Sequence, residues 1–99
     1  MIKRTLFTTL FLLASASTLS DDYSQELYQI YCSGCHAVSA SNAPQAFSPD
    51  WAPIVQRKGL DTLVNNAIRG IGNMPPMGTC SECTADDMRD IIVYMTEAK

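Results

Sequence analysis

Two cysteines and a histidine stand together in the first half of the chain, in the segment Cys32-Ser33-Gly34-Cys35-His36. On a helix, thiols three positions apart lie about one turn from each other, within reach of the two vinyl groups of one porphyrin. The adjacent imidazole can then bind the iron as the proximal ligand. His36 is the only histidine in the sequence, so no other imidazole competes for this position. The motif predicts covalent attachment of one c-type haem, with thioether bonds at Cys32 and Cys35 and His36 on the iron.

Two other uses of the cysteines fit the sequence less well. A thioredoxin-like redox pair requires a central sheet, and the sequence shows no convincing strand. A tetrahedral zinc site built from Cys32, Cys35, Cys80 and Cys83 would have reasonable spacing. It would also need free thiolates, which an oxidising compartment disfavours. Haem attachment is therefore the preferred interpretation.

The segment from Gly70 to Cys83 offers the second axial ligand of the iron. It contains Met74 and Met77, and a thioether is a soft ligand that raises the haem potential. We prefer Met74, because it directly precedes two prolines that hold the backbone extended. The alternative is that Met74 fills space while Met77 binds the iron.

The second C-x-x-C pair, Cys80 and Cys83, is followed by Thr84 and therefore has no adjacent histidine to serve a second haem. We interpret it as a short disulfide loop that ties the end of the methionine segment to the start of the last helix. A pair of reactive thiols at a helix N-terminus is the alternative.

Helices must position these residues. We expect a first helix to begin near Asp22, with Gln25 as a capping partner, and to run through Cys35. Its apolar residues Leu27, Ile30 and Tyr31 would share one face. Residues 37–49 are rich in Ser, Asn, Ala and Pro and are expected to form a loop.

Three further helices are expected in the second half of the chain. One covers residues 50–58 and ends at Gly59. The next ends at Gly70 and carries an apolar stripe of Leu60, Leu63, Val64, Ala67 and Ile68. The last begins after Thr84, a good N-cap with Asp87 three residues later, and turns one face to the core through Met88, Ile91, Ile92 and Met95. The pattern predicts a small all-α domain of three to four helices around one haem.

The N-terminal residues have the features of an export signal. Lys3 and Arg4 precede an apolar run that is too short to span a membrane, and Ala14-Ser15-Ala16 fits a signal peptidase site. We expect residues 1–16 to be cleaved, with a boundary up to residue 20 as an alternative, leaving a domain of residues 17–99. An uncleaved anchor that faces the periplasm is the less favoured interpretation.

Cleavage would leave an acidic protein. Without residues 1–16, five basic side chains remain against ten acidic ones, a net charge of −5. This charge disfavours binding to nucleic acid or to anionic membranes and favours a basic patch on a protein partner. An 83-residue domain buries only about 60% of its unfolded surface, so covalent cross-links or a cofactor are expected to support it.

With these motifs in place, the chain resembles the class I c-type cytochromes and, more narrowly, the cytochromes c5. The resemblance covers about residues 25–98. The C-x-x-C-H motif is common to all c-type cytochromes. The more specific part is Met74-Pro75-Pro76 followed by Gly78-Thr79-Cys80-x-x-Cys83 and a helix with Tyr94-Met95.

The resemblance implies roles for several residues. Met74 matches the family's axial methionine, and Pro44 matches the proline whose carbonyl orients the proximal imidazole. Trp51 resembles the family's aromatic wall beside the haem, although a simple core tryptophan fits equally well. The extra disulfide of the family falls on Cys80 and Cys83. Position 77 departs from the pattern, because we expect a basic residue where this chain has Met.

The expected function is single-electron shuttling in the periplasm between respiratory partners, through a haem c with His36 and Met74 as axial ligands. Contacts would be transient, the protein a monomer or weak dimer, and substrate turnover absent. The alternative is a catalytic or gas-sensing haem protein with an open sixth position. Such chemistry needs a distal acid–base group, and the chain has no second histidine to supply one.

Overall fold

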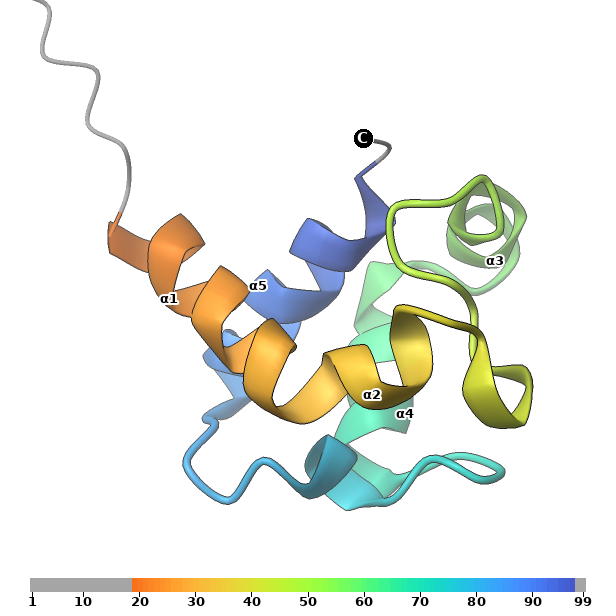
Figure 1. The fold of residues 1–99 in the computed structure, drawn as a ribbon. Coiled ribbons are helices and arrows are strands. Elements are labelled where there is room, and N and C mark those ends of the chain that lie inside the picture. Colours follow the sequence, from red (N-terminus) through yellow and green to blue (C-terminus); the bar gives the residue numbers. More distant parts are fainter. Residues whose placement is uncertain (1–18, 98–99) are drawn as a thin grey trace, which may run out of the picture.

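Five α-helices build the part of the chain that the structure, a computed structural model, describes, residues 19–97 (Figure 1). They are α1 Leu19–Leu27, α2 Ser33–His36, α3 Trp51–Lys58, α4 Leu60–Arg69 and α5 Ala85–Thr96. Within residues 19–97 the only β-type pairing is an isolated bridge between Ile71 and Met74. The all-α prediction is confirmed. The predicted signal peptide, residues 1–16, lies outside the described residues.

The first helical segment is continuous but changes its winding just before the cysteine motif. α1 passes into a π-helical turn, η1 (Tyr28–Cys32), and then into α2. The helix is already present at Leu19, so the predicted start near Asp22 is wrong. The earlier start places Asp22 in the first turn of α1, where the helix dipole favours an acidic residue.

The π turn also changes which residues the first segment buries. We expected Leu27, Ile30 and Tyr31 to form one apolar face, but Ile30 is 60% exposed. A π turn accommodates one extra residue, so the apolar face is displaced along the sequence. Tyr28 and Cys32 are buried in place of Ile30. The prediction for Ile30 is therefore wrong, because it assumed an unbroken α-helical period.

The second half of the chain folds close to expectation. α3 ends at Lys58, and Gly59 separates it from α4 with a φ of +79°. Gly70 follows α4 with a φ of +86°, a conformation that glycine adopts without steric cost. A short 3-10 turn, η3 (Pro76–Thr79), lies between α4 and α5. The long loop likewise contains a 3-10 turn, η2 (Ala40–Asn42).

α5 begins with the predicted cap. Thr84 Oγ1 accepts a hydrogen bond from the Asp87 amide at 3.1 Å, and the Asp87 carboxylate accepts one from the Thr84 amide at 2.9 Å. This reciprocal pair is a capping box, which satisfies two amides that the helix itself leaves free. α5 therefore begins directly after Thr84, the N-cap residue predicted from the sequence.

The core lies where α5 meets its neighbours. α1 and α4 both pack against α5 (Figure 1). Leu27, Met88 and Ile91 are each only 1% exposed at these contacts. The predicted buried face of α5 is confirmed, and so is the apolar stripe of α4, whose residues are buried or pack partly buried against the core.

None of the helices between residues 19 and 97 combines the length and apolar character that a membrane span requires.

Candidate haem site

The two cysteines of the C-x-x-C-H motif lie at the end of the first helical segment. Cys32 closes the π turn and is buried, whereas Cys35 is exposed on α2. Neither takes part in a disulfide. Burial raises the pKa of the Cys32 thiol to about 11, so this group stays protonated at neutral pH. Cys32 in η1 and Cys35 in α2 are therefore the two residues that would hold a porphyrin covalently.

His36 is buried at the C-terminus of α2 and has a defined tautomer. Its Nδ1 lies 2.8 Å from the carbonyl oxygen of Pro44. Because a carbonyl oxygen can only accept, Nδ1 must carry the hydrogen, and the lone pair remains on Nε2. The His36 carbonyl also accepts a hydrogen bond from the Ala46 amide at 2.7 Å, so the loop is fastened to this residue at two points. The imidazole is therefore oriented with Nε2 free to bind a metal.

Trp51 lies beside this imidazole. The two ring centroids are 5.9 Å apart and the planes are tilted by 31°. The indole Nε1–H donates to the Gln45 carbonyl at 2.9 Å, which fixes the ring orientation. Sequence reasoning did not identify Gln45, whose side chain also donates to the Ala37 carbonyl at 3.3 Å. A glutamine in a polar loop carries no signal of that role.

The segment after α4 presents the two candidate methionines in different backbone settings. Met74 sits in the bridge with Ile71. Pro75 is extended as predicted, but Pro76 begins the 3-10 turn η3, so the predicted extension of both prolines holds only for the first. Met77 lies in η3 with a φ of +61°, an uncommon conformation for a residue with a side chain. Both side chains are partly buried and pack against the core.

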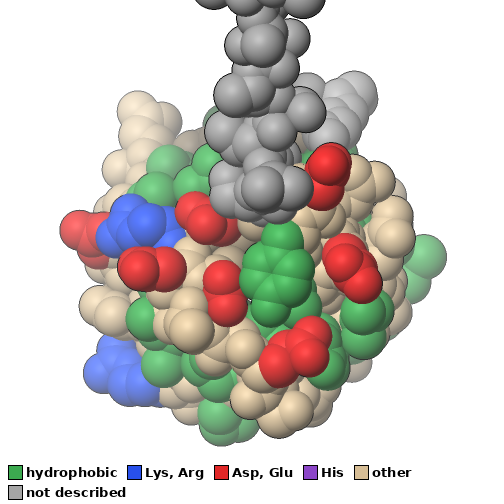
Figure 2. Space-filling model, turned by 90° about the vertical axis from the view of Figure 1, so that its left-hand side faces the viewer, with side chains coloured by type: hydrophobic (Ala, Val, Ile, Leu, Met, Phe, Trp, Pro, Cys, Tyr) green, Lys and Arg blue, Asp and Glu red, His purple; other side chains and the backbone are tan. Residues whose placement is uncertain are grey.

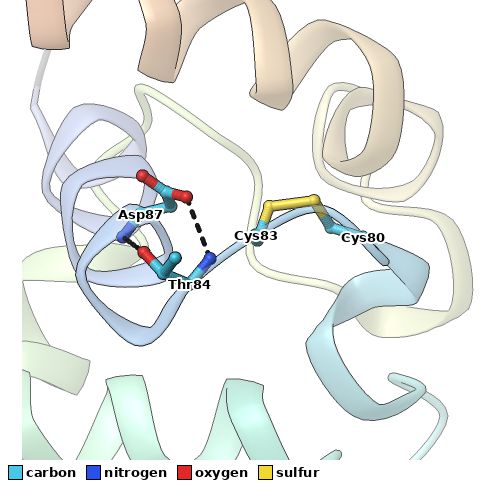
Figure 3. The surroundings of a disulfide bond; sticks show 4 residues. All are labelled: Cys80, Cys83, Thr84 and Asp87. Carbon is cyan, nitrogen blue, oxygen red and sulfur yellow. Dashed lines mark hydrogen bonds between the residues drawn. A yellow bond between two sulfur atoms is a disulfide. The ribbon is translucent and has the colours of Figure 1, made fainter.

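The second cysteine pair is oxidised in the structure. Cys80 and Cys83 form a disulfide between η3 and the start of α5, next to the capping box (Figure 3). Cys80 is 1% exposed, so the bridge is part of the core. The Cys80 amide donates to the Met77 carbonyl at 3.0 Å, which connects the bridge to the methionine segment.

These features agree with one c-type haem and not with zinc. The disulfide removes Cys80 and Cys83 from any thiolate cluster. Across residues 19–97 no three His, Cys, Asp or Glu side chains gather as a metal site. Two unpaired thiols and an imidazole with a free Nε2 remain, which is the donor set that covalent haem attachment requires.

Comparison with known proteins points to the same class. The family model described as "Cytochrome C oxidase, cbb3-type, subunit III" matches residues 21–95. Cytochrome c5 of Azotobacter vinelandii is 37% identical over 68 residues, which cover 67% of this chain and 82% of that protein. Cytochrome c5 of Ectopseudomonas mendocina is 35% identical over 68 residues, covering 67% and 78%.

Solved structures agree in fold. A cytochrome c in an electron-transfer complex with nitrite reductase superposes with a TM-score of 0.67 and 32% identity, over 74% of this chain and 89% of that one. A mono-haem ferrocytochrome c from Shewanella putrefaciens gives a TM-score of 0.65 at 32% identity, over 77% and 94%.

The fold, the motif and these relatives define a class I c-type cytochrome, an electron-transfer protein with one covalently bound haem c. Within that class, the chain is similar to the cytochromes c5. The resemblance noted from the sequence is confirmed.

Proposed function

We propose that this cytochrome carries single electrons in the periplasm, with the haem iron held between Nε2 of His36 and the thioether of Met74. Cys32 and Cys35 would form the two thioether bonds to the porphyrin. When bound, the haem supplies an iron that cycles between Fe(II) and Fe(III). The observation that carries the proposal is the hydrogen bond from His36 Nδ1 to the Pro44 carbonyl, because it leaves Nε2 free and makes the imidazole a better donor.

The residues around the iron would keep its geometry fixed in both oxidation states. His36 is buried, bound to the loop through Pro44 and Ala46, and flanked by Trp51. In this proposal Trp51 forms the aromatic wall of the site on the His36 side. A rigid setting of this kind leaves little to reorganise when an electron arrives. This arrangement suits electron transfer without turnover of a substrate.

Met74 is preferred to Met77 because of its backbone. Pro75 holds the chain extended directly after Met74, with φ −69° and ψ 159°. The Ile71 amide and carbonyl both bond to the backbone of Met74, at 3.1 and 2.8 Å. A thioether on this restrained backbone loses little freedom on binding iron, whereas Met77 lies in a 3-10 turn with a φ of +61°.

A matched pair of variants tests the ligand assignment. In the ferric holoprotein, Met74→Ala should abolish the far-red absorption band of a sulfur–iron bond, while Met77→Ala should retain it. The two side chains are of equal size and both partly buried, so Met77→Ala controls for the loss of packing. Loss of the band in Met77→Ala alone would refute the assignment to Met74.

The rival function, catalysis or gas sensing at an open sixth position, makes a different prediction. An open iron binds carbon monoxide rapidly in the reduced native protein. An iron held by His36 and Met74 does so only after the thioether leaves. Rapid binding by the wild type would therefore favour the rival.

The proposed partners are proteins that dock transiently through a basic surface. One structural neighbour is a cytochrome c seen in complex with nitrite reductase. In this chain acidic side chains gather on one face (Figure 2). The pKa of Tyr23 is raised first by desolvation and then by the nearby carboxylates of Asp87, Glu82 and Glu26. Export would be tested by N-terminal sequencing and intact mass of the periplasmic protein, which should begin between residues 17 and 21.

A further inference from the structure

The residue that follows α4 lies directly against the segment that carries Met74. A Cβ placed on Gly70 would lie 3.0 Å from the Met74 carbonyl oxygen, 3.0 Å from the Pro76 nitrogen and 3.1 Å from Pro76 Cδ. Two of these atoms are backbone and the third belongs to a rigid ring, so none can rotate away. Gly70 therefore allows a close approach, and a side chain in its place would push the Met74 and Pro76 backbone away.

The next residue fixes the same segment through hydrogen bonds. The Ile71 amide donates to the Met74 carbonyl at 3.1 Å, and the Met74 amide donates to the Ile71 carbonyl at 2.8 Å. The Ile71 side chain is 46% exposed. Ile71 thus acts on Met74 mainly through its peptide groups.

We propose that Gly70 and the peptide groups of Ile71 form a backbone seat for Met74 that positions its thioether on the iron. Gly70 and Ile71 are positioning residues in this account, acting through Met74. The inference rests on the proposed function, because it takes Met74 as the axial ligand. It adds that the end of α4, and not only the Pro75-Pro76 pair, determines where the sulfur lies.

The chain supplies a matched control in Gly59, at the other end of α4. Its backbone angles, φ +79° and ψ 154°, are close to the φ +86° and ψ 146° of Gly70. Both conformations strain a residue with a side chain to a similar degree. A Cβ on Gly59, however, has no atom within 4 Å. The two substitutions therefore share the backbone strain and differ in the contact with Met74.

The experiment compares Gly70→Ala with Gly59→Ala in the holoprotein, both in a Met77→Ala background so that Met77 cannot replace Met74 on the iron. Two measurements report the sulfur–iron bond: the far-red band of the ferric protein and the rate of cyanide binding. Cyanide binds only when the thioether has dissociated from the iron, so its rate follows the population of the dissociated form. Thermal unfolding, measured in parallel, reports the shared strain.

Gly59→Ala should lower the melting temperature and keep both the band and the slow cyanide reaction. Gly70→Ala should lose most of the band and bind cyanide roughly tenfold faster or more. Equal spectra and equal cyanide rates in the two variants would overturn the proposal. If instead Met74→Ala alone leaves the band of the wild type intact, the ligand assignment fails, which is a separate result.

If the Gly70→Ala protein does not incorporate haem, a second pair of variants tests the same proposal. Ile71→Pro removes the amide that donates to Met74, and the ψ of 146° at Gly70 suits a residue before proline. Ile71→Ala keeps that amide and trims only a half-exposed side chain. We expect faster cyanide binding in Ile71→Pro and wild-type behaviour in Ile71→Ala. Identical rates in this pair would contradict the proposed seat.

Discussion

The disulfide between Cys80 and Cys83 should contribute measurably to stability despite its short loop. The bridge closes a loop of four residues. The chain-entropy relation for cross-links then gives about 2 kcal/mol of stabilisation at 25 °C. For a domain of this size, each 1 kcal/mol shifts the melting temperature by roughly 4–8 °C, so loss of the bridge should lower it by roughly 8–16 °C.

The variant for this test is Cys80→Ala with Cys83→Ser. Alanine is chosen at position 80 because Cys80 is 1% exposed, and a serine there would bury an unpaired hydroxyl. Removing both cysteines also avoids a free thiol that could react with its neighbours. Ser81→Ala, a change at an exposed position inside the same loop, is the control and should alter stability by less than about 0.5 kcal/mol.

The assay is guanidinium unfolding of the ferric holoprotein, followed by circular dichroism at one fixed pH. We expect the free energy of unfolding to fall by about 2 kcal/mol in the double variant. The far-red band should also weaken, because the segment that carries Met74 loses its covalent tie to the start of α5. A loss no larger than that of Ser81→Ala would refute a structural role for the bridge.

Three further outcomes follow from the fold and its charge. Thr84→Ala removes one half of the capping box and should cost about 1 kcal/mol in thermal or chemical unfolding, whereas an unchanged midpoint would mean that the cap is dispensable. Met88→Ala leaves a cavity at a 1% exposed position and should cost about 2–5 kcal/mol, against less than about 1 kcal/mol for the exposed Val93→Ala. Electron transfer to a basic redox protein, measured by stopped flow, should slow as ionic strength rises from 10 to 200 mM, about the range over which screening becomes strong. A rate that does not depend on salt would argue against docking through the acidic face.

Local patterns predicted the second half of the fold well. The start of α5 depends on Thr84 and Asp87, which are three residues apart, so the capping box was visible in the sequence. Gly59 and Gly70 mark the ends of α3 and α4 for the same reason, since each helix end is a local event. The C-x-x-C-H motif is also local, and it indicated the cofactor without reference to the fold.

Predictions that depended on an unbroken helix or on distant contacts were less complete. Ile30 was placed on one apolar face with Leu27 and Tyr31 because an α-helical period was assumed through the π turn, and no residue in the sequence of that turn signals the change. The close approach of Gly70 to Met74 and Pro76 arises from the path of the backbone after α4. Gly70 was recognised as the end of a helix, but its contact with the methionine segment requires coordinates.

The roles of Pro44 and Trp51 came from family resemblance, and residue spacing alone did not suggest them. The structure shows Pro44 as the hydrogen-bond partner of His36 and Trp51 beside the same ring. Both contacts bring together residues 8 to 15 positions apart across an irregular loop. Propensity and periodicity do not describe such a loop, so only a structure or a relative could place these residues.

The most direct test of a His36- and Met74-ligated electron carrier is a proton NMR spectrum of the reduced holoprotein with its methionine methyl groups labelled. The ring current of the porphyrin shifts the methyl of an iron-bound methionine far upfield of all others. We predict one such signal, absent in Met74→Ala and present in Met77→Ala. A wild-type spectrum with no upfield methyl, or one whose upfield methyl belongs to Met77, would contradict the account.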